Sequence, residues 1–135
     1  MGKESSPAKV LEEFLNAVAE SKQEYQYAYD AVNEEDRRLQ DLLHEVEFAP
    51  NKAERNRSTT KLQQSRRRRR KYKDMVKKNE KLVKFFEEQK NRETLNRMRQ
   101  LLGQQRKEEE YLASERTYKP RMSQGGGDNM SEHEK

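Results

Sequence analysis

A seven-residue repeat of apolar side chains runs through the first third of the chain, and it restricts the fold more than any other feature. Six positions spaced by seven are all apolar: Leu11, Val18, Tyr25, Val32, Leu39 and Val46. The seam positions between them are mostly apolar too, with polar gaps at Ser21 and Lys22 and at Glu35 and Asp36. A heptad pattern is typical of a helix that packs along its length against another helix. The sequence therefore predicts a long helix over about residues 8–48.

Proline and asparagine divide the rest of the chain into further elements. Pro50 should end the first helix, because proline lacks an N–H and disfavours helix in the residue before it. A second helix is expected over about 52–88, and a shorter third helix over about 92–114, with Asn91 as its N-cap. Residues 117–135, with their glycine run and polar company, are predicted to form a disordered tail. Residues 1–116 would then be a single helical domain.

Composition agrees with an all-α fold. Leu, Val and Phe together supply 21 of 135 residues, and there is no Ile or Trp, so little apolar surface is available for an ordinary globular core. Ala, Glu, Lys, Leu and Arg supply 69 residues, about half of the chain, as in coiled coils and long helices. We therefore predict a long antiparallel helical hairpin, coiled-coil-like, with the third helix added to it.

A short connection around Pro50 makes the first two helices antiparallel neighbours. Residue i of the first helix should then lie near residue 100 − i of the second. This register brings Leu39 toward Leu62 and Val18 toward Val83. It also places the polar break at Glu34, Glu35 and Asp36 opposite the start of an arginine-rich block, so these acids are the expected intramolecular partners of that block.

Charge is strongly segregated along the chain. Residues 1–51 carry a net charge of −7, residues 52–78 carry +11, and residues 79–135 carry +1. The basic block consists of Arg66, Arg67, Arg68, Arg69, Arg70, Lys71 and Lys73. Consecutive residues of a helix fan out by about 100° each, so only about two arginines, Arg66 with Arg69 or Arg70, are expected to reach the first helix. The remaining arginines, Arg67, Arg68 and Arg70 among them, are predicted to point elsewhere.

Two functions fit such a block. Arginine is forked to match phosphate oxygens, and a basic helical stripe binds the nucleic-acid backbone by releasing counterions, so the first hypothesis is contact with nucleic-acid phosphates through Arg66–Lys73. The alternative is a protein–protein interaction module that presents the block to an acidic protein surface. Of the tyrosines, Tyr72 is expected in the hairpin seam and only Tyr27 is expected to be free for stacking.

The sequence contains no pattern of residues typical of a catalytic or metal site. There is no cysteine, and neither His44 nor His133 has a second histidine at ligand spacing. We therefore expect no enzymatic activity, no metal and no cofactor. The longest apolar runs are two or three residues, so no membrane span and no membrane partner are expected, and the cytoplasm is the expected location.

Apolar residues that one seam cannot cover, including Phe85, Phe86 and Leu101, predict a homodimer.

Several short strings resemble small helical proteins encoded by phages and prophages of Gram-positive bacteria. The resemblance spans residues 40–121 and is carried by four strings: Leu42 to Phe48, the arginine block ending in Lys73-Asp74, Leu101-Leu102-Gly103, and Arg116 to Arg121. These proteins as a group have no assigned activity to carry over. The resemblance implies a phage context and, with it, a host cytoplasm as the location, and it implies nothing about mechanism. In that context the protein–protein interaction alternative would be a phage-encoded modulator or inhibitor of a host or viral protein.

Overall fold

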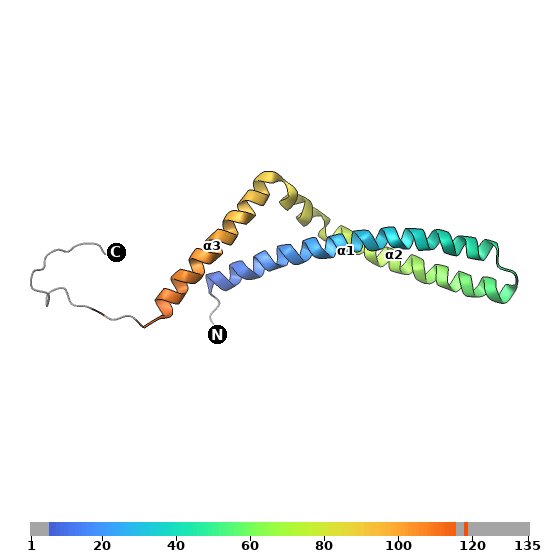
Figure 1. Cartoon of the computed structure of the whole chain (residues 1–135), viewed down its shortest axis with the longest axis horizontal. Coiled ribbons are helices and arrows are strands. Elements are labelled where there is room, and N and C mark those ends of the chain that lie inside the picture. The colour runs from blue at the N-terminus through green and yellow to red at the C-terminus, as the bar shows by residue number, and fades with distance from the viewer. Residues whose placement is uncertain (1–5, 116–117, 119–135) are drawn as a thin grey trace, which may run out of the picture.

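A computed structural model of the chain describes residues 6–115 and Tyr118. It contains three helices, α1 (Pro7–Glu47), α2 (Lys52–Glu87) and α3 (Gln89–Ala113), and the described residues include no strand. Helices α1 and α2 form an antiparallel hairpin. Helix α3 starts at the C-terminal end of α2 and runs toward the N-terminal end of α1 (Figure 1). The predicted all-α hairpin with a shorter third helix is confirmed. The tail predicted for 117–135 lies outside the described residues except for Tyr118.

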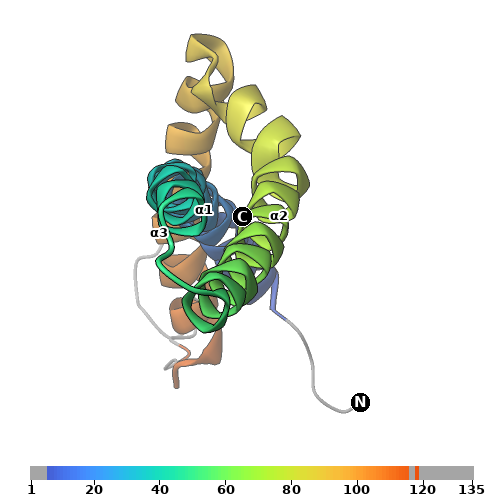
Figure 2. The ribbon, with the colours of Figure 1, turned by 90° about the vertical axis from the view of Figure 1, so that its right-hand side faces the viewer.

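Side-chain caps start α1 and α2 where the sequence predicts. The Ser6 hydroxyl accepts the Lys9 N–H at 3.0 Å, and Pro7 occupies the first turn, where its missing N–H costs nothing. The Asn51 side chain accepts the Glu54 N–H at 2.8 Å directly after Pro50, and so begins α2. The connection between the two helices is therefore short. Seen from the end of the hairpin that carries this connection, α1 and α2 lie side by side (Figure 2).

The junction between α2 and α3 differs from the prediction. Asn91 was expected to cap α3, but α3 begins at Gln89, and Glu88 alone separates the two helices in an extended conformation. The Asn91 side-chain amide instead donates to the Phe85 carbonyl at 2.8 Å and to Glu88 Oε1 at 3.2 Å. The single extended residue Glu88 is therefore enough to turn the chain between the two helices. The Asn91 amide satisfies the Phe85 carbonyl, one of the backbone acceptors left without a helical partner at the end of α2.

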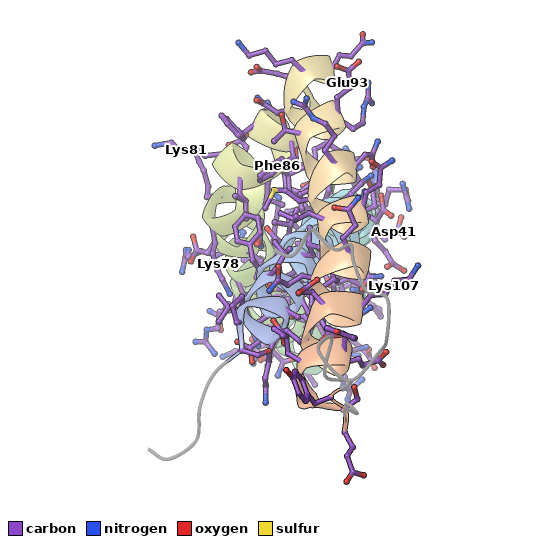
Figure 3. The ribbon with its side chains drawn as sticks, turned by 90° about the vertical axis from the view of Figure 1, so that its left-hand side faces the viewer. Asp41, Lys78, Lys81, Phe86, Glu93 and Lys107 are labelled. Atoms are coloured by element: carbon purple, nitrogen blue, oxygen red, sulfur yellow. The ribbon has the colours of Figure 1, made fainter. Side chains whose placement is uncertain are left out.

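The apolar core lies where all three helices meet. It consists of Ala8, Leu15, Val18, Leu95 and Leu102, with Leu11, Phe86 and Met98 packed against it. Figure 3 shows Phe86 on the side of α2 that faces the other helices, while Lys78 and Lys81 of the same helix point outward. Two polar contacts hold α3 against the start of α1: Glu109 accepts the Ala8 N–H at 2.9 Å, and Arg106 pairs with Glu12 at 3.1 Å.

Beyond this core the hairpin is two helices thick, and its register is the predicted one. Ser21 donates to Asn79 Oδ1 at 2.7 Å, and Ser65 donates to Glu35 Oε1 at 2.7 Å, so the residue numbers of each pair sum to 100. All four side chains are buried. The polar gaps in the first helix are therefore filled by matching polar residues of the second, and buried hydrogen bonds alternate with apolar contacts along the seam.

Candidate nucleic-acid interface

The basic block lies near the middle of α2, and two of its arginines contact acids of α1. Arg68 Nε lies 3.0 Å from Glu35 Oε2, and Arg69 Nε donates to Asp36 Oδ1. The expectation that Arg68 points away from α1 was therefore wrong. Arg68 and Arg69 stand three and four residues after the buried Ser65, which puts them on either side of the seam. Arg66 has no ion pair with an acid of α1 among the described residues.

Glu35 is the centre of this contact. Its side chain is buried, with the residue 4% exposed, and it accepts hydrogen bonds from Ser65, Arg68 and Arg38. Burial by itself raises the pKa of the Glu35 carboxyl, but the bonds from Ser65, Arg68 and Arg38 outweigh burial, and the net effect lowers the pKa. Glu35 is thus held as a carboxylate whose charge is matched inside the seam.

Glu34 differs from the other two predicted acidic partners. Its carboxylate lies 3.9 Å from the Arg38 guanidinium of its own helix, and within the described residues it forms no ion pair with α2. One position along a helix is a rotation of about 100°, so Glu34 cannot share the seam with Glu35. Glu34 instead lies beside Tyr27 and Tyr72 in a groove on one side of the hairpin.

The other side of the hairpin carries an open groove of about 400 Å³ that is rich in cations. Four residues of the basic block line it, together with Asp74 and with Leu39 of α1: Arg66, Arg69, Arg70 and Lys73. Arg66, Arg70 and Lys73 are exposed, and none of them has an ion pair within the described residues. We call this side the cationic flank. Lys77, four residues after Lys73 on the same face of α2, extends it.

The opposite groove, which we call the acidic flank, has a different chemistry. Asp30 and Glu34 of α1 line it, along with Tyr27, Arg68 and Tyr72. The carboxylates Glu35 and Glu24 neutralise α2 cations on or near this flank, the second through Lys78 at 3.5 Å. The hairpin therefore separates an acidic flank, where cations are paired, from a cationic flank, where three are not.

The remaining block residues, Arg67 and Lys71, are exposed and have no ion pair within the described part of the chain. Arg67 lies on the side of α2 turned away from α1, since it is about half a turn from Ser65 of the seam. Lys71 lies nearer the acidic flank, within electrostatic range of Tyr27. All seven predicted residues thus belong to one stretch of α2. The structure divides them into two that contact α1, three on the cationic flank, Arg67 on the outer face and Lys71 near the acidic flank.

Sequence reasoning missed two features of this region. The first is the set of polar partners in the seam, although Ser58, Ser65 and Asn79 fall on one seven-residue repeat of α2 that could have revealed them. The second is the environment of Tyr27, whose ring meets Tyr72 edge-on with 6.0 Å between centroids. Tyr27 is therefore not free, and its flank is the acidic one.

The chain matches no protein family, no curated protein and no solved structure. Within the described residues, no helix is long and apolar enough to cross a membrane. The same part of the chain contains no cluster of three or more His, Cys, Asp or Glu side chains suited to a metal ion. The His44 ring stacks on Phe48, with 6.2 Å between ring centroids.

Proposed function

We propose that this protein is a non-enzymatic helical binding protein that contacts nucleic-acid phosphates through the block Arg66–Lys73. One observation carries the proposal. Arg66, Arg70 and Lys73 line one open groove without an ion pair among the described residues, while the acids of α1 gather on the other flank. A row of unpaired cations on one helix is suited to a row of phosphates, which it binds by counterion release.

The energetic argument supports a ligand rather than a purely structural role. Like charges three and four residues apart on a helix destabilise it by about 0.2–0.5 kcal/mol per pair. Arg66 and Arg70, and Arg70 and Lys73, are such pairs. An exposed ion pair contributes only about 0–1 kcal/mol and a buried one little net stability, and only Arg68 and Arg69 of the block form ion pairs with α1. The block thus costs stability in the free protein, and a polyanion would offset that cost.

The test is the salt dependence of binding to labelled DNA, measured by fluorescence anisotropy from about 50 mM salt upward. With three to five phosphate contacts, the slope of log affinity against log salt should be roughly −3 to −5 on duplex DNA. The variant Arg66→Gln/Arg67→Gln/Arg70→Gln should reduce the size of that slope by up to about 3. Its control, Lys61→Gln/Lys78→Gln/Lys81→Gln, removes the same charge from outside the block and should change the slope by less than about 1. Absence of binding at 50 mM salt would refute the proposal.

A protein–protein interaction module is the second candidate, and exposed apolar side chains favour it. Val10, Phe85 and Leu101 are each about half exposed near the three-helix core, and such side chains commonly mark an interface. The same residues support the proposed homodimer. Phe86, which the sequence counted among the uncovered residues, is half-buried in the core. Sedimentation at tens of micromolar should show a dimer, and a strict monomer would dismiss it.

The phage context is proposed on the sequence resemblance alone. In that context the nucleic acid or acidic protein that meets the cationic flank would be a phage or host molecule in the host cytoplasm. The modulator or inhibitor role belongs to the second candidate. Retention of a defined host protein on the wild-type chain, lost with Phe85→Ser, would support that candidate.

A further inference from the structure

A pair of tyrosines on α1 lies beside the cationic flank. Tyr29 and Tyr25 are one helical turn apart, with 6.0 Å between ring centroids. Tyr29 occupies the same heptad position as Asp36, whose carboxylate accepts a bond from Arg69, a residue of the cationic groove. Tyr25 occupies the same heptad position as Leu39, which lines that groove. Both tyrosines therefore belong to the cationic flank.

The register sets the height of Tyr29 along the hairpin. Because paired residue numbers sum to 100, Tyr29 is level with position 71 of α2, between Arg70 and Lys73. At a rise of about 1.5 Å per residue, both of these cations lie within about 3 Å of it along the axis. The Tyr29 residue is 50% exposed, so part of its ring is open to solvent at the level of two unpaired cations on the same flank.

We infer that the cationic flank binds single-stranded nucleic acid, with a base stacked on Tyr29 and the backbone phosphates held by Arg70, Lys73 and Lys77. The inference rests on the proposed function and names the form of nucleic acid. Proteins that bind single strands combine a cationic track for the backbone with aromatic rings for the bases. A duplex keeps its bases stacked inside, so it would use the cations of this flank but not the tyrosine.

Tyr27 provides an internal control for this inference. It is two residues from Tyr29, and at 61% it is even more exposed. However, its ring meets Tyr72 edge-on, and Asp30 and Glu34 line the same groove, where they would repel phosphates. If aromatic exposure alone sufficed, Tyr27 would serve as well as Tyr29. Lys71 also lies within electrostatic range of Tyr27. The structure nevertheless favours Tyr29, because its ring does not share a groove with Asp30 and Glu34 and is level with Arg70 and Lys73.

The experiment compares Tyr29→Leu with Tyr27→Leu in the full chain, using a labelled 12-nucleotide single strand and the duplex of the same sequence. Stacking is worth about 1–3 kcal/mol per base, so Tyr29→Leu should weaken single-strand binding roughly 5- to 150-fold and duplex binding less than about 2-fold. Tyr27→Leu should change neither by more than about 2-fold. Tyr29→Phe should restore single-strand binding, because the ring rather than the hydroxyl stacks. Neither leucine variant should change the salt slope, since no charge is removed.

Two results would overturn the inference without touching the proposed function: equal effects of the two tyrosine variants, or tighter binding of the parent to the duplex than to the single strand. A parent that binds neither form at about 50 mM salt would refute the proposed function itself. Circular dichroism on each variant separates loss of binding from loss of folding, and a Tyr29→Phe variant that folds but does not recover binding would also count against stacking.

Discussion

The two ends of this molecule are built from the same kind of helix but are held together by different forces. At the three-helix end, Leu15, Val18 and Leu95 are buried among other apolar side chains. At the two-helix end, the seam contains a buried carboxylate, Glu35, and a buried hydroxyl, Ser65, which is 0% exposed. Apolar burial stabilises roughly in proportion to area, whereas a buried ion pair contributes little net stability and mainly specifies which residues pair. The first end therefore supplies stability, and the second fixes the register.

This division has a functional consequence. The block Arg66–Lys73 belongs to the two-helix end, where only α1 lies against α2. Two flanks of α2 are open there, and the fixed register gives each its own charge. A third helix on that end would cover one flank. The two-helix end thus keeps a cationic surface accessible, and the three-helix end supplies the apolar burial that the two-helix end lacks.

The largest expected effect comes from the three-helix core. Leu95→Ala should lower the free energy of unfolding by about 2–5 kcal/mol, because three helices cannot close around the cavity. Leu62→Ala, a matched change of a buried leucine in the two-helix seam, should cost less, since two helices can close around a cavity more easily than three. Urea denaturation followed by circular dichroism measures both. A larger loss for Leu62→Ala would reverse the proposed roles of the two ends.

The next effect concerns the buried carboxylate. Glu35→Ala should destabilise the hairpin by about 2 kcal/mol, because Ser65 loses its acceptor while remaining buried. The double variant Glu35→Leu/Ser65→Ala should recover most of that loss, since Arg68 is partly exposed and can turn to water. Equilibrium unfolding of the two variants checks this. If the double variant is less stable than Glu35→Ala, the polar layer contributes stability and not only register.

Acid should weaken both ends through different carboxylates. The pKa of Glu35 is lowered by Ser65, Arg68 and Arg38 against the opposing effect of burial, and the pKa of Glu109 is lowered by Gln105 and the Ala8 N–H. A carboxylate whose pKa is lowered in the folded state stabilises that state fully at pH values above the usual glutamate pKa, about 4.3. This stabilisation is lost as the pH falls through the lowered pKa.

Thermal unfolding between pH 6 and pH 2.5 measures this dependence. Glu35→Gln should show a smaller loss of stability below about pH 4 than the parent, since one of the linked groups is gone. Glu109→Gln should also reduce the acid dependence, and Glu110→Gln, an adjacent exposed residue, is its control. An unchanged pH profile in Glu35→Gln would mean that the carboxylate is not held by its partners in solution.

The smallest expected effect is the coupling between Asp36 and Arg69. Both side chains are partly exposed, so a double-mutant cycle of Asp36→Asn and Arg69→Gln should give about 0.2–1 kcal/mol. The same cycle between Asp36 and Arg66, a pair that the structure does not join, should give no coupling. Coupling of Asp36 to Arg66 instead of Arg69 would show that the register of this part of the hairpin differs from the one described.

Much of the fold follows from the sequence because two signals agree. The heptad from Leu11 to Val46 and the proline at position 50 predict a long helix and its end, and the apolar residues opposite predict the register. The start of α3 was missed because the turn after α2 uses one extended residue, Glu88, and no helix-breaking residue type marks it.

The candidate site was less predictable. The block itself is plain in the sequence, but which arginines contact α1 depends on the geometry of the seam around Ser65. Counting rotation from Arg66 without that anchor assigned Arg68 to the outside. The same lack of an anchor made Tyr27 seem free, whereas Tyr29 was counted among the seam positions that face Tyr72. In the structure Tyr72 contacts Tyr27, and Tyr29 is half exposed on the other flank.

Site-resolved hydrogen exchange, with and without a 12-nucleotide single strand, tests the central claim most directly. In the free protein, the amides of Leu62 and Arg68 should exchange through openings of lower free energy than those of Val18 and Leu95, because fewer apolar contacts protect them. Added single strand should slow exchange over residues 66–77 and leave the three-helix core unchanged. Uniform protection along α2 in the free protein, or oligonucleotide protection confined to the three-helix end, would contradict the division between a stabilising end and a binding end.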